Sequence, residues 1–116
     1  MIKIYGLKNC DTCRKALKWL VAEGVAHEFA DFRADGLDPE QAKRWLSDLG
    51  HETLINRRGT TWRQLDEDQK IDLDNDKALA LVLKNAALIK RPVVEASGQV
   101  MVGFTPAVMA AMAKAS

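Results

Sequence analysis

The chain has 116 residues, of which 47% are hydrophobic and 28% charged, as in an ordinary globular domain. Seventeen basic residues against sixteen acidic ones give a net charge of +1, which argues against a polycation that binds nucleic acid or a membrane surface. The apolar runs are much shorter than the roughly 20 residues that span a bilayer. We therefore expect a single domain over residues 1–116.

The first third of the chain predicts a strand, a helix and a second strand. Residues 2–5 alternate apolar and polar side chains, as a half-buried strand does. Apolar residues then recur at helical spacing from Cys13 to Val21, and Gly24 is suited to end that helix. A second strand is predicted over residues 26–32. Such a β-α-β unit usually pairs its two strands in parallel.

The middle of the chain is polar and predicts helices. Asp38 followed by proline is typical of a helix start, and we expect that helix to end at Gly50. A short helix is predicted at residues 61–65 and a longer one, rich in Ala and Leu, at residues 76–88. These helices occupy about residues 38–88.

The last part of the chain returns to strands. Residues 93–95 and 99–102 flank a Ser-Gly dipeptide, which is typical of a tight turn and predicts a hairpin. A Thr-Pro pair then opens a final helix over residues 105–114. Without its middle, the chain has the order βαβ then ββα of a thioredoxin-like sheet. We therefore expect an α/β fold with a helical insertion between the two halves.

Cys10 and Cys13 are the strongest chemical signal, because they form a Cys-x-x-Cys motif between the first strand and the first helix. The unpaired N–H groups at a helix N-terminus favour an anion. Cys10 is therefore the candidate nucleophile, with a lowered pKa. Cys13 belongs to the apolar stripe one turn further on and is the candidate disulfide partner. Thr12 lies between them, where we expect it to tune the redox potential.

Two other interpretations of the cysteines stay open. They could be inert core residues, or half of a zinc site that would need His27 and His51, whose spacing is not that of metal ligands. We expect no metal. Residues 1–6 form no apolar secretory leader, so we expect a cytoplasmic location. There, two cysteines are more often catalytic or metal-binding than joined in a structural disulfide.

Two arginine-containing segments are candidate anion sites. Arg91 precedes Pro92 at the start of a predicted strand, beside the cysteine loop of a thioredoxin-like sheet, and we expect a cis peptide bond there. The planar guanidinium of Arg91 would then face an oxyanion or a glutathione carboxylate. Asn56, Arg57 and Arg58 form the second segment. The alternative for both segments is a plain solvated surface.

Together these segments resemble the arsenate reductase (ArsC) family over nearly the whole chain. The resemblance is closest to the small YffB-type members and extends to the Spx regulators. It implies a thioredoxin-like fold with a helical insertion, in which a cysteine nucleophile attacks arsenate and glutathione resolves the adduct. The matching segments are the Cys-x-x-Cys motif, residues 56–65, Lys90-Arg91-Pro92 and Val102-Gly103-Phe104.

The resemblance also implies roles for particular residues. By position, the nucleophile is Cys10, one oxyanion-binding arginine is Arg91, and a second falls on residues 56–58. The position of a third arginine holds Gly103, and that of a histidine before the nucleophile holds Gly6. A missing arginine removes a charge-assisted hydrogen bond, so we do not expect efficient arsenate reduction.

We therefore expect a small cytosolic thiol oxidoreductase that depends on glutathione. Cys10 would be the nucleophile and Cys13 the resolving thiol, while Arg58 and Arg91 would contact an oxyanion or glutathione. The expected partners are glutathione or glutaredoxin and a small oxyanion or disulfide, with no bound cofactor, nucleic acid or membrane. A monomer is expected. The alternatives are an Spx-like redox sensor that binds RNA polymerase, and a family member that has lost its chemistry.

Overall fold

The computed structural model describes residues 1–115, which fall into two compact units. The first unit consists of residues 1–36 together with the chain from residue 91 onward, and the second consists of residues 37–90. The second unit spans the segment predicted as a helical insertion, and the first contains the two halves on either side of it. That both units form a single domain stays a prediction.

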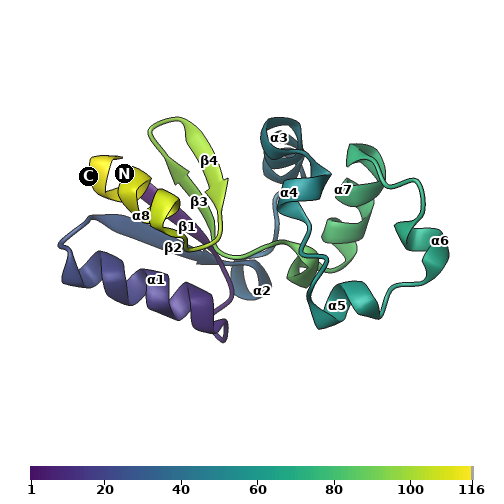
Figure 1. The fold of residues 1–116 in the computed structure, drawn as a ribbon, viewed down its shortest axis with the longest axis horizontal. Coiled ribbons are helices and arrows are strands. Elements are labelled where there is room, and N and C mark those ends of the chain that lie inside the picture. Colours follow the sequence, from purple (N-terminus) through teal and green to yellow (C-terminus); the bar gives the residue numbers. More distant parts are fainter. Residues whose placement is uncertain (116) are drawn as a thin grey trace. The chain divides into compact units, whose positions relative to one another are not determined.

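The first unit is built on a four-stranded sheet with the strand order β2-β1-β3-β4 (Figure 1). The central strand β1 (Ile2–Gly6) pairs in parallel with β2 (His27–Asp31) and antiparallel with β3 (Val93–Ala96). A hairpin then joins β3 to the edge strand β4 (Gln99–Val102). The predicted βαβ and ββα halves are therefore present, which confirms the thioredoxin-like α/β fold.

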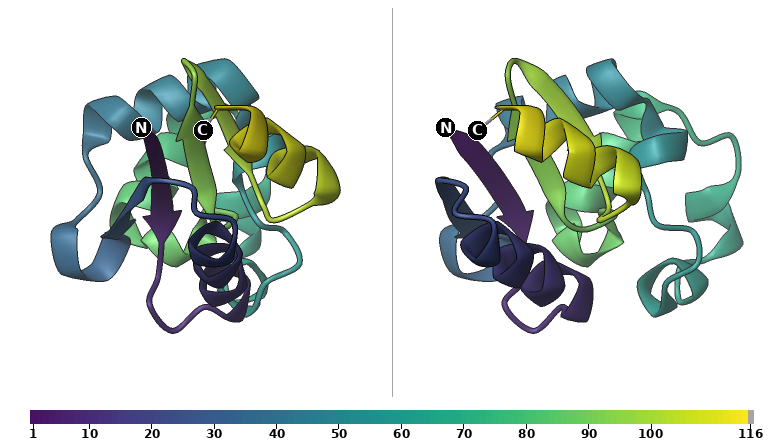
Figure 2. Two further views of the ribbon diagram at one scale, coloured as in Figure 1. Left: turned by 90° about the vertical axis from the view of Figure 1, so that its left-hand side faces the viewer. Right: turned by 60° about the vertical axis from the view of Figure 1, so that its left-hand side comes forward.

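Two helices of the first unit, α1 (Asp11–Ala22) and α8 (Pro106–Ala115), pack on one face of this sheet (Figure 2). Alternate residues of a strand point to the same face, so Ile2 and Ile4 both meet these helices. The ring of Trp19 on α1 also packs edge-on against Phe104, with 6.0 Å between ring centroids, which ties α1 to the segment before α8. The buried core residues of this cluster are Ile2, Ile4, Leu20, Val25, Val94, Ala96, Val108 and Met112.

The apolar face of α1 is narrower than predicted. Cys13, Ala16 and Leu20 are fully buried, whereas Val21 is 71% exposed. At 3.6 residues per turn, Val21 lies about 80° around the helix axis from Cys13, outside the buried stripe. Gly24 follows with a φ of 68°, a conformation that glycine adopts without strain, and so the helix ends where predicted.

The second unit is helical, as predicted. The helix α3 (Pro39–Leu49) begins as expected, because the carboxylate of Asp38 accepts the N–H of Glu40 at 3.1 Å. Trp45 is 1% exposed, so core packing accounts for it. The other elements are α4 (His51–Leu54), α5 (Thr60–Arg63), α6 (Glu67–Lys70), α7 (Asn75–Lys84) and the short 3-10 helix η1 (Ala86–Leu88).

The helix predicted over residues 76–88 is interrupted. It ends at Lys84, because Asn85 adopts an extended conformation with a φ of −148° and a ψ of 98°. The side chain of Asn85 accepts the N–H of Ala87 at 3.1 Å and starts η1 instead. Asparagine competes in this way with helical hydrogen bonding.

Three further short elements, α2 (Phe32–Asp35), α4 and α6, each span four residues and were not predicted. Asp66 and Gln69 form a reciprocal capping box that starts α6, a local signal that the sequence contained. Within residues 1–115, no helix combines the length and the apolar character needed to cross a membrane.

Candidate functional site

Cys10 lies at the junction between β1 and α1. It is the N-cap residue of α1, in an extended conformation with a φ of −94° and a ψ of 122°. Its N–H donates to the carbonyl of Leu7 at 3.1 Å, and its carbonyl accepts the N–H of Arg14 at 3.0 Å. Residues 7–10 therefore form a closed turn that places a partly exposed thiol at the N-terminus of α1.

The surroundings of Cys10 favour its thiolate. Partial burial raises the pKa of this thiol, but the backbone N–H and side chain of Cys13 and the guanidinium of Arg91 together outweigh the burial, so the pKa is lowered. Hydrogen-bond donors and a positive charge stabilise the thiolate more than the neutral thiol. The structure therefore has the feature expected of a reactive cysteine, which is a lowered pKa at a partly exposed site.

Cys13 differs from Cys10 in both its burial and the direction of its pKa shift. Its side chain is fully buried, and this burial, with the adjacent Cys10 thiolate, raises the pKa of Cys13 to about 12. The N–H of Leu7 and the charge of Arg91 lower it only in part. Cys10 therefore loses its proton at a lower pH than an ordinary cysteine, whereas Cys13 keeps its proton to a higher pH.

Gly6 makes room for the sulfur of Cys13. A Cβ atom built on Gly6 would lie 2.5 Å from Cys13 Sγ and 3.8 Å from a ring carbon of Phe29. The first distance is far below the normal separation of two nonbonded atoms. A side chain at position 6 and the observed position of the Cys13 sulfur therefore exclude one another.

Arg91 and Pro92 come from the start of β3, about 80 residues beyond Cys10 in the sequence. The Arg91–Pro92 peptide bond is cis, as expected. Pro92 is buried, and its carbonyl accepts the N–H of Gly103 at 2.8 Å. Because β3 pairs with β1, this turn brings the guanidinium of Arg91 to Cys10, where it lowers the pKa of the thiol.

Asp31 is a residue at this site that the sequence analysis missed. It is 6% exposed and ends β2, where it lies opposite Gly6 in the parallel register. Its carboxylate accepts the N–H of Lys8, in the turn before Cys10, at 2.8 Å. Hydrogen bonds from the N–H groups of Lys8, Arg33 and Ala34 outweigh the effect of burial and lower the pKa of Asp31. The sequence contained a signal for this residue. An aspartate lies near the end of the predicted second strand, and that strand was expected to pair with the strand that leads into the cysteine loop.

The other predicted site residues are Thr12 and residues 56–58. Thr12 is exposed on the first turn of α1. Asn56, Arg57 and Arg58 belong to the second unit, where Asn56 Oδ1 accepts the N–H of Arg58 at 3.1 Å and the guanidinium of Arg57 lies 5.5 Å from the centre of the Trp62 ring. The structure thus brings Arg91 to the thiols, and the role of residues 56–58 stays a prediction.

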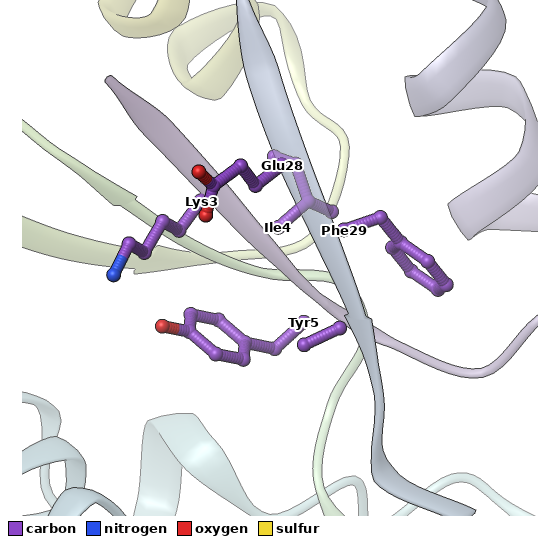
Figure 3. Close-up of a pocket in the computed structure, with 6 residues that line it drawn as sticks. Lys3, Ile4, Tyr5, Glu28 and Phe29 are labelled. Atoms are coloured by element: carbon purple, nitrogen blue, oxygen red, sulfur yellow. The ribbon is translucent and has the colours of Figure 1, made fainter. Parts of the chain in front are cut away.

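A pocket of about 170 Å³ lies over the parallel strands β1 and β2 (Figure 3). Its lining includes neither cysteine, and the hydroxyl of Tyr5 donates to Glu95 at 3.0 Å, so nothing here links the pocket to thiol chemistry. The residues that line this pocket are Lys3, Ile4, Tyr5, Glu28, Phe29 and Ala30.

Within residues 1–115, no three His, Cys, Asp or Glu side chains cluster closely enough to hold a metal.

The fold and the sequence of this chain are similar to those of solved proteins. The solved structure of a protein called YFFB is 48% identical and superposes with a TM-score of 0.91, covering 97% of this chain and 99% of that one. An arsenate reductase (ArsC) related protein from Brucella melitensis is 44% identical with a TM-score of 0.79, covering 97% of this chain and 94% of that one.

A transcriptional regulator is also similar to this chain, at lower sequence identity. The global transcriptional regulator Spx of Listeria innocua is 26% identical over 109 residues, which cover 90% of this chain and 80% of that protein. The sequence model of the ArsC family matches residues 5–112, a range that includes both cysteines, Arg91 and Pro92. The chain therefore belongs to the ArsC family.

Proposed function

We propose that this protein is a thiol oxidoreductase that reduces a disulfide or a glutathione adduct, with Cys10 as nucleophile and Cys13 as resolving thiol. The observation that carries the proposal is the difference between the two sulfurs. Cys10 has a lowered pKa and is partly exposed, whereas Cys13 is buried with its pKa raised to about 12. Thiolate is the form that attacks a disulfide, so the two cysteines have distinct roles.

In the first step, the Cys10 thiolate attacks one sulfur of the substrate disulfide. A bond forms between Cys10 Sγ and that sulfur while the substrate S–S bond breaks, and the other substrate sulfur leaves as a thiolate. Arg91, whose guanidinium already acts on Cys10, is positioned to hold the leaving anion or a glutathione carboxylate, since its planar fork suits carboxylates.

In the second step, Cys13 attacks Cys10. The Cys10 thiolate is one cause of the raised pKa of Cys13, and that cause disappears once Cys10 is part of a mixed disulfide. Cys13 then loses its proton more readily and attacks Cys10 Sγ, which releases the second substrate sulfur as a thiolate. The substrate gains two electrons, its two thiolates take up the proton released by Cys13 and one proton from solvent, and the cysteines become a disulfide.

Two molecules of glutathione, or one dithiol glutaredoxin, would return the protein to the dithiol form and become oxidised themselves. A cytoplasmic location suits this cycle, because glutathione keeps thiols reduced there. We propose no bound cofactor for it. The cycle also suits a monomer, since Cys10, Cys13 and Arg91 come from one chain.

Disulfides are better candidate substrates than arsenate. A related protein from Brucella melitensis is described as arsenate reductase related, but in this chain the position of a third oxyanion-binding arginine holds Gly103 and that of a histidine holds Gly6. The contact at Gly6 gives a physical reason, because a side chain there would displace the Cys13 sulfur. We therefore propose that this chain exchanged part of an oxyanion site for a second thiol.

The test is turnover of a glutathionylated peptide with glutathione as the reductant, followed by a coupled assay of glutathione disulfide formation and by mass spectrometry of the protein. We expect Cys10→Ser to abolish turnover. Cys13→Ser should instead accumulate a mixed disulfide on Cys10, because the second step is blocked. The proposal fails if Cys10→Ser turns over at the wild-type rate, or if no adduct forms on Cys13→Ser.

A redox-sensing regulator is the second candidate, because Spx of Listeria innocua is similar over 90% of this chain. In that case the Cys10–Cys13 pair would switch binding to RNA polymerase between its dithiol and disulfide forms. A pull-down of purified RNA polymerase with each form distinguishes the two functions. Capture by one form only, without turnover in the assay above, would favour the regulator.

A further inference from the structure

Asp31 does more than start the short helix α2. One carboxylate oxygen, Oδ1, accepts the N–H groups of Arg33 at 2.7 Å and Ala34 at 3.2 Å, which caps α2. The other oxygen, Oδ2, accepts the N–H of Lys8 at 2.8 Å. Lys8 is 23 residues away in the sequence, so the second oxygen has a contact that helix capping does not require.

The contact to Lys8 acts on the turn that carries the reactive cysteine. Residues 7–10 are closed by the hydrogen bond from the N–H of Cys10 to the carbonyl of Leu7 at 3.1 Å, and Lys8 lies inside that turn. Leu7 also faces the second sulfur, because its N–H lowers the pKa of Cys13 in part. A turn held in this way determines where both sulfurs lie relative to α1.

The position of Asp31 is fixed by its burial and by its own backbone contacts. Asp31 is 6% exposed and is paired in register with Gly6 of β1, and its own N–H donates to Asp35 at 3.0 Å. A buried hydrogen bond to an ionised carboxylate is stronger than one between neutral groups. In contrast, Lys8 and Asn9 in the turn are exposed, and the hydrogen bond from the N–H of Lys8 ties this part of the turn to the end of β2.

We propose that Asp31 is a positioning residue for the thiol chemistry, which holds the 7–10 turn so that Cys10 Sγ meets the Cys13 N–H and Arg91. This inference rests on the proposed function, in which the Cys10 thiolate is the nucleophile. Asp31 acts through the turn and contacts no substrate itself. Its negative charge would on its own disfavour a thiolate nearby, so a positioning role and a purely electrostatic role act in opposite directions.

The experiment uses Asp31→Ser and Asp31→Ala, with Asp38→Ser as the matched control. Serine is a good N-cap, so Asp31→Ser retains the start of α2, but its single short oxygen cannot also reach Lys8. Asp31→Ala removes both contacts. Asp38 caps α3 in the second unit with the same chemistry, accepting the N–H of Glu40 at 3.1 Å. Circular dichroism checks that each variant is folded.

The readout is the rate of Cys10 alkylation by iodoacetamide against pH, with mass spectrometry locating the label. We expect both Asp31 variants to react with a profile moved to higher pH, and at about pH 6 the rate should fall about threefold or more as the thiolate fraction drops. Asp38→Ser should react like the wild type. In parallel, the Lys8 amide proton should exchange with solvent faster in Asp31→Ser than in the wild type.

The outcomes separate this inference from the proposed function. A folded Asp31→Ser protein with the wild-type profile, or with a profile moved to lower pH, would overturn the positioning role while leaving the Cys10 thiolate intact. A wild-type Cys10 that titrates in the ordinary range of about 8.5 would instead overturn the proposed function. If Asp31→Ala does not fold, Asp31→Ser alone decides, since it keeps the cap.

Discussion

Gly6→Ala tests whether the Cys13 sulfur needs the space at position 6. The added methyl group would lie 2.5 Å from Cys13 Sγ, and Cys13 is fully buried, so the sulfur has to move. Overpacking of this kind costs about 1–3 kcal/mol. Gly6 lies in a strand without a positive φ, so alanine itself would stabilise the backbone by about 0.5–1 kcal/mol. The expected net effect is a loss of up to about 2.5 kcal/mol in unfolding free energy.

The effect of Gly6→Ala on the free energy of unfolding should have the opposite sign when the Cys13 sulfur is absent. In Cys13→Ala the Sγ atom is removed, and the next contact of the new methyl group is the Cβ of residue 13 at 3.6 Å, an ordinary van der Waals separation. Gly6→Ala should then stabilise the protein by about 0.5–1 kcal/mol. The double-mutant cycle should give a coupling energy of about 1–3 kcal/mol.

Urea denaturation of the reduced wild type, the two single variants and the double variant measures this coupling. Gly24→Ala serves as the control, because Gly24 has a φ of 68° and nothing within 4 Å of an added Cβ. The change in unfolding free energy caused by Gly24→Ala should be the same in the wild type and in Cys13→Ala. Free energies for Gly6→Ala and Cys13→Ala that add to within about 0.5 kcal/mol would refute the contact argument.

Two further predictions follow from the pKa shifts. The pKa of Cys13 is raised from 9.0 to about 12 on folding, so the stability it contributes is fully present below about pH 9 and is lost as the pH rises toward 12. The urea midpoint of the reduced wild type should therefore fall more than that of Cys13→Ala between about pH 8 and pH 10.5, and equal falls would contradict the burial of this thiol. Arg91→Ala should move the Cys10 alkylation profile to higher pH and weaken glutathione binding measured by calorimetry, whereas unchanged values would exclude Arg91 from the site.

The elements that the sequence predicted correctly depend on neighbouring residues. Asp38 followed by proline starts α3, and the Ser-Gly dipeptide turns the β3–β4 hairpin, because capping and turn geometry involve side chains a few positions apart. The interruption at Asn85 was missed for a related reason. Its side chain competes with the helix through a local hydrogen bond, but periodicity alone does not show which of the two local structures is more stable.

The sequence by itself determined that the chain has a βαβ half and a ββα half, with a Cys-x-x-Cys motif at the start of the first helix, because apolar periodicity and turn residues act locally. The predicted fold and the family resemblance already placed Arg91 beside the cysteine loop. Only the tertiary structure decided that the Arg91 guanidinium lowers the pKa of Cys10, that Asp31 anchors Lys8, and that Gly6 leaves room for Cys13 Sγ. These contacts depend on which strands pair and in which register, since the parallel β1–β2 pair and the antiparallel β1–β3 pair bring distant segments to the same edge of the sheet. Pairing and register are set by burial of the whole core, which no local pattern contains.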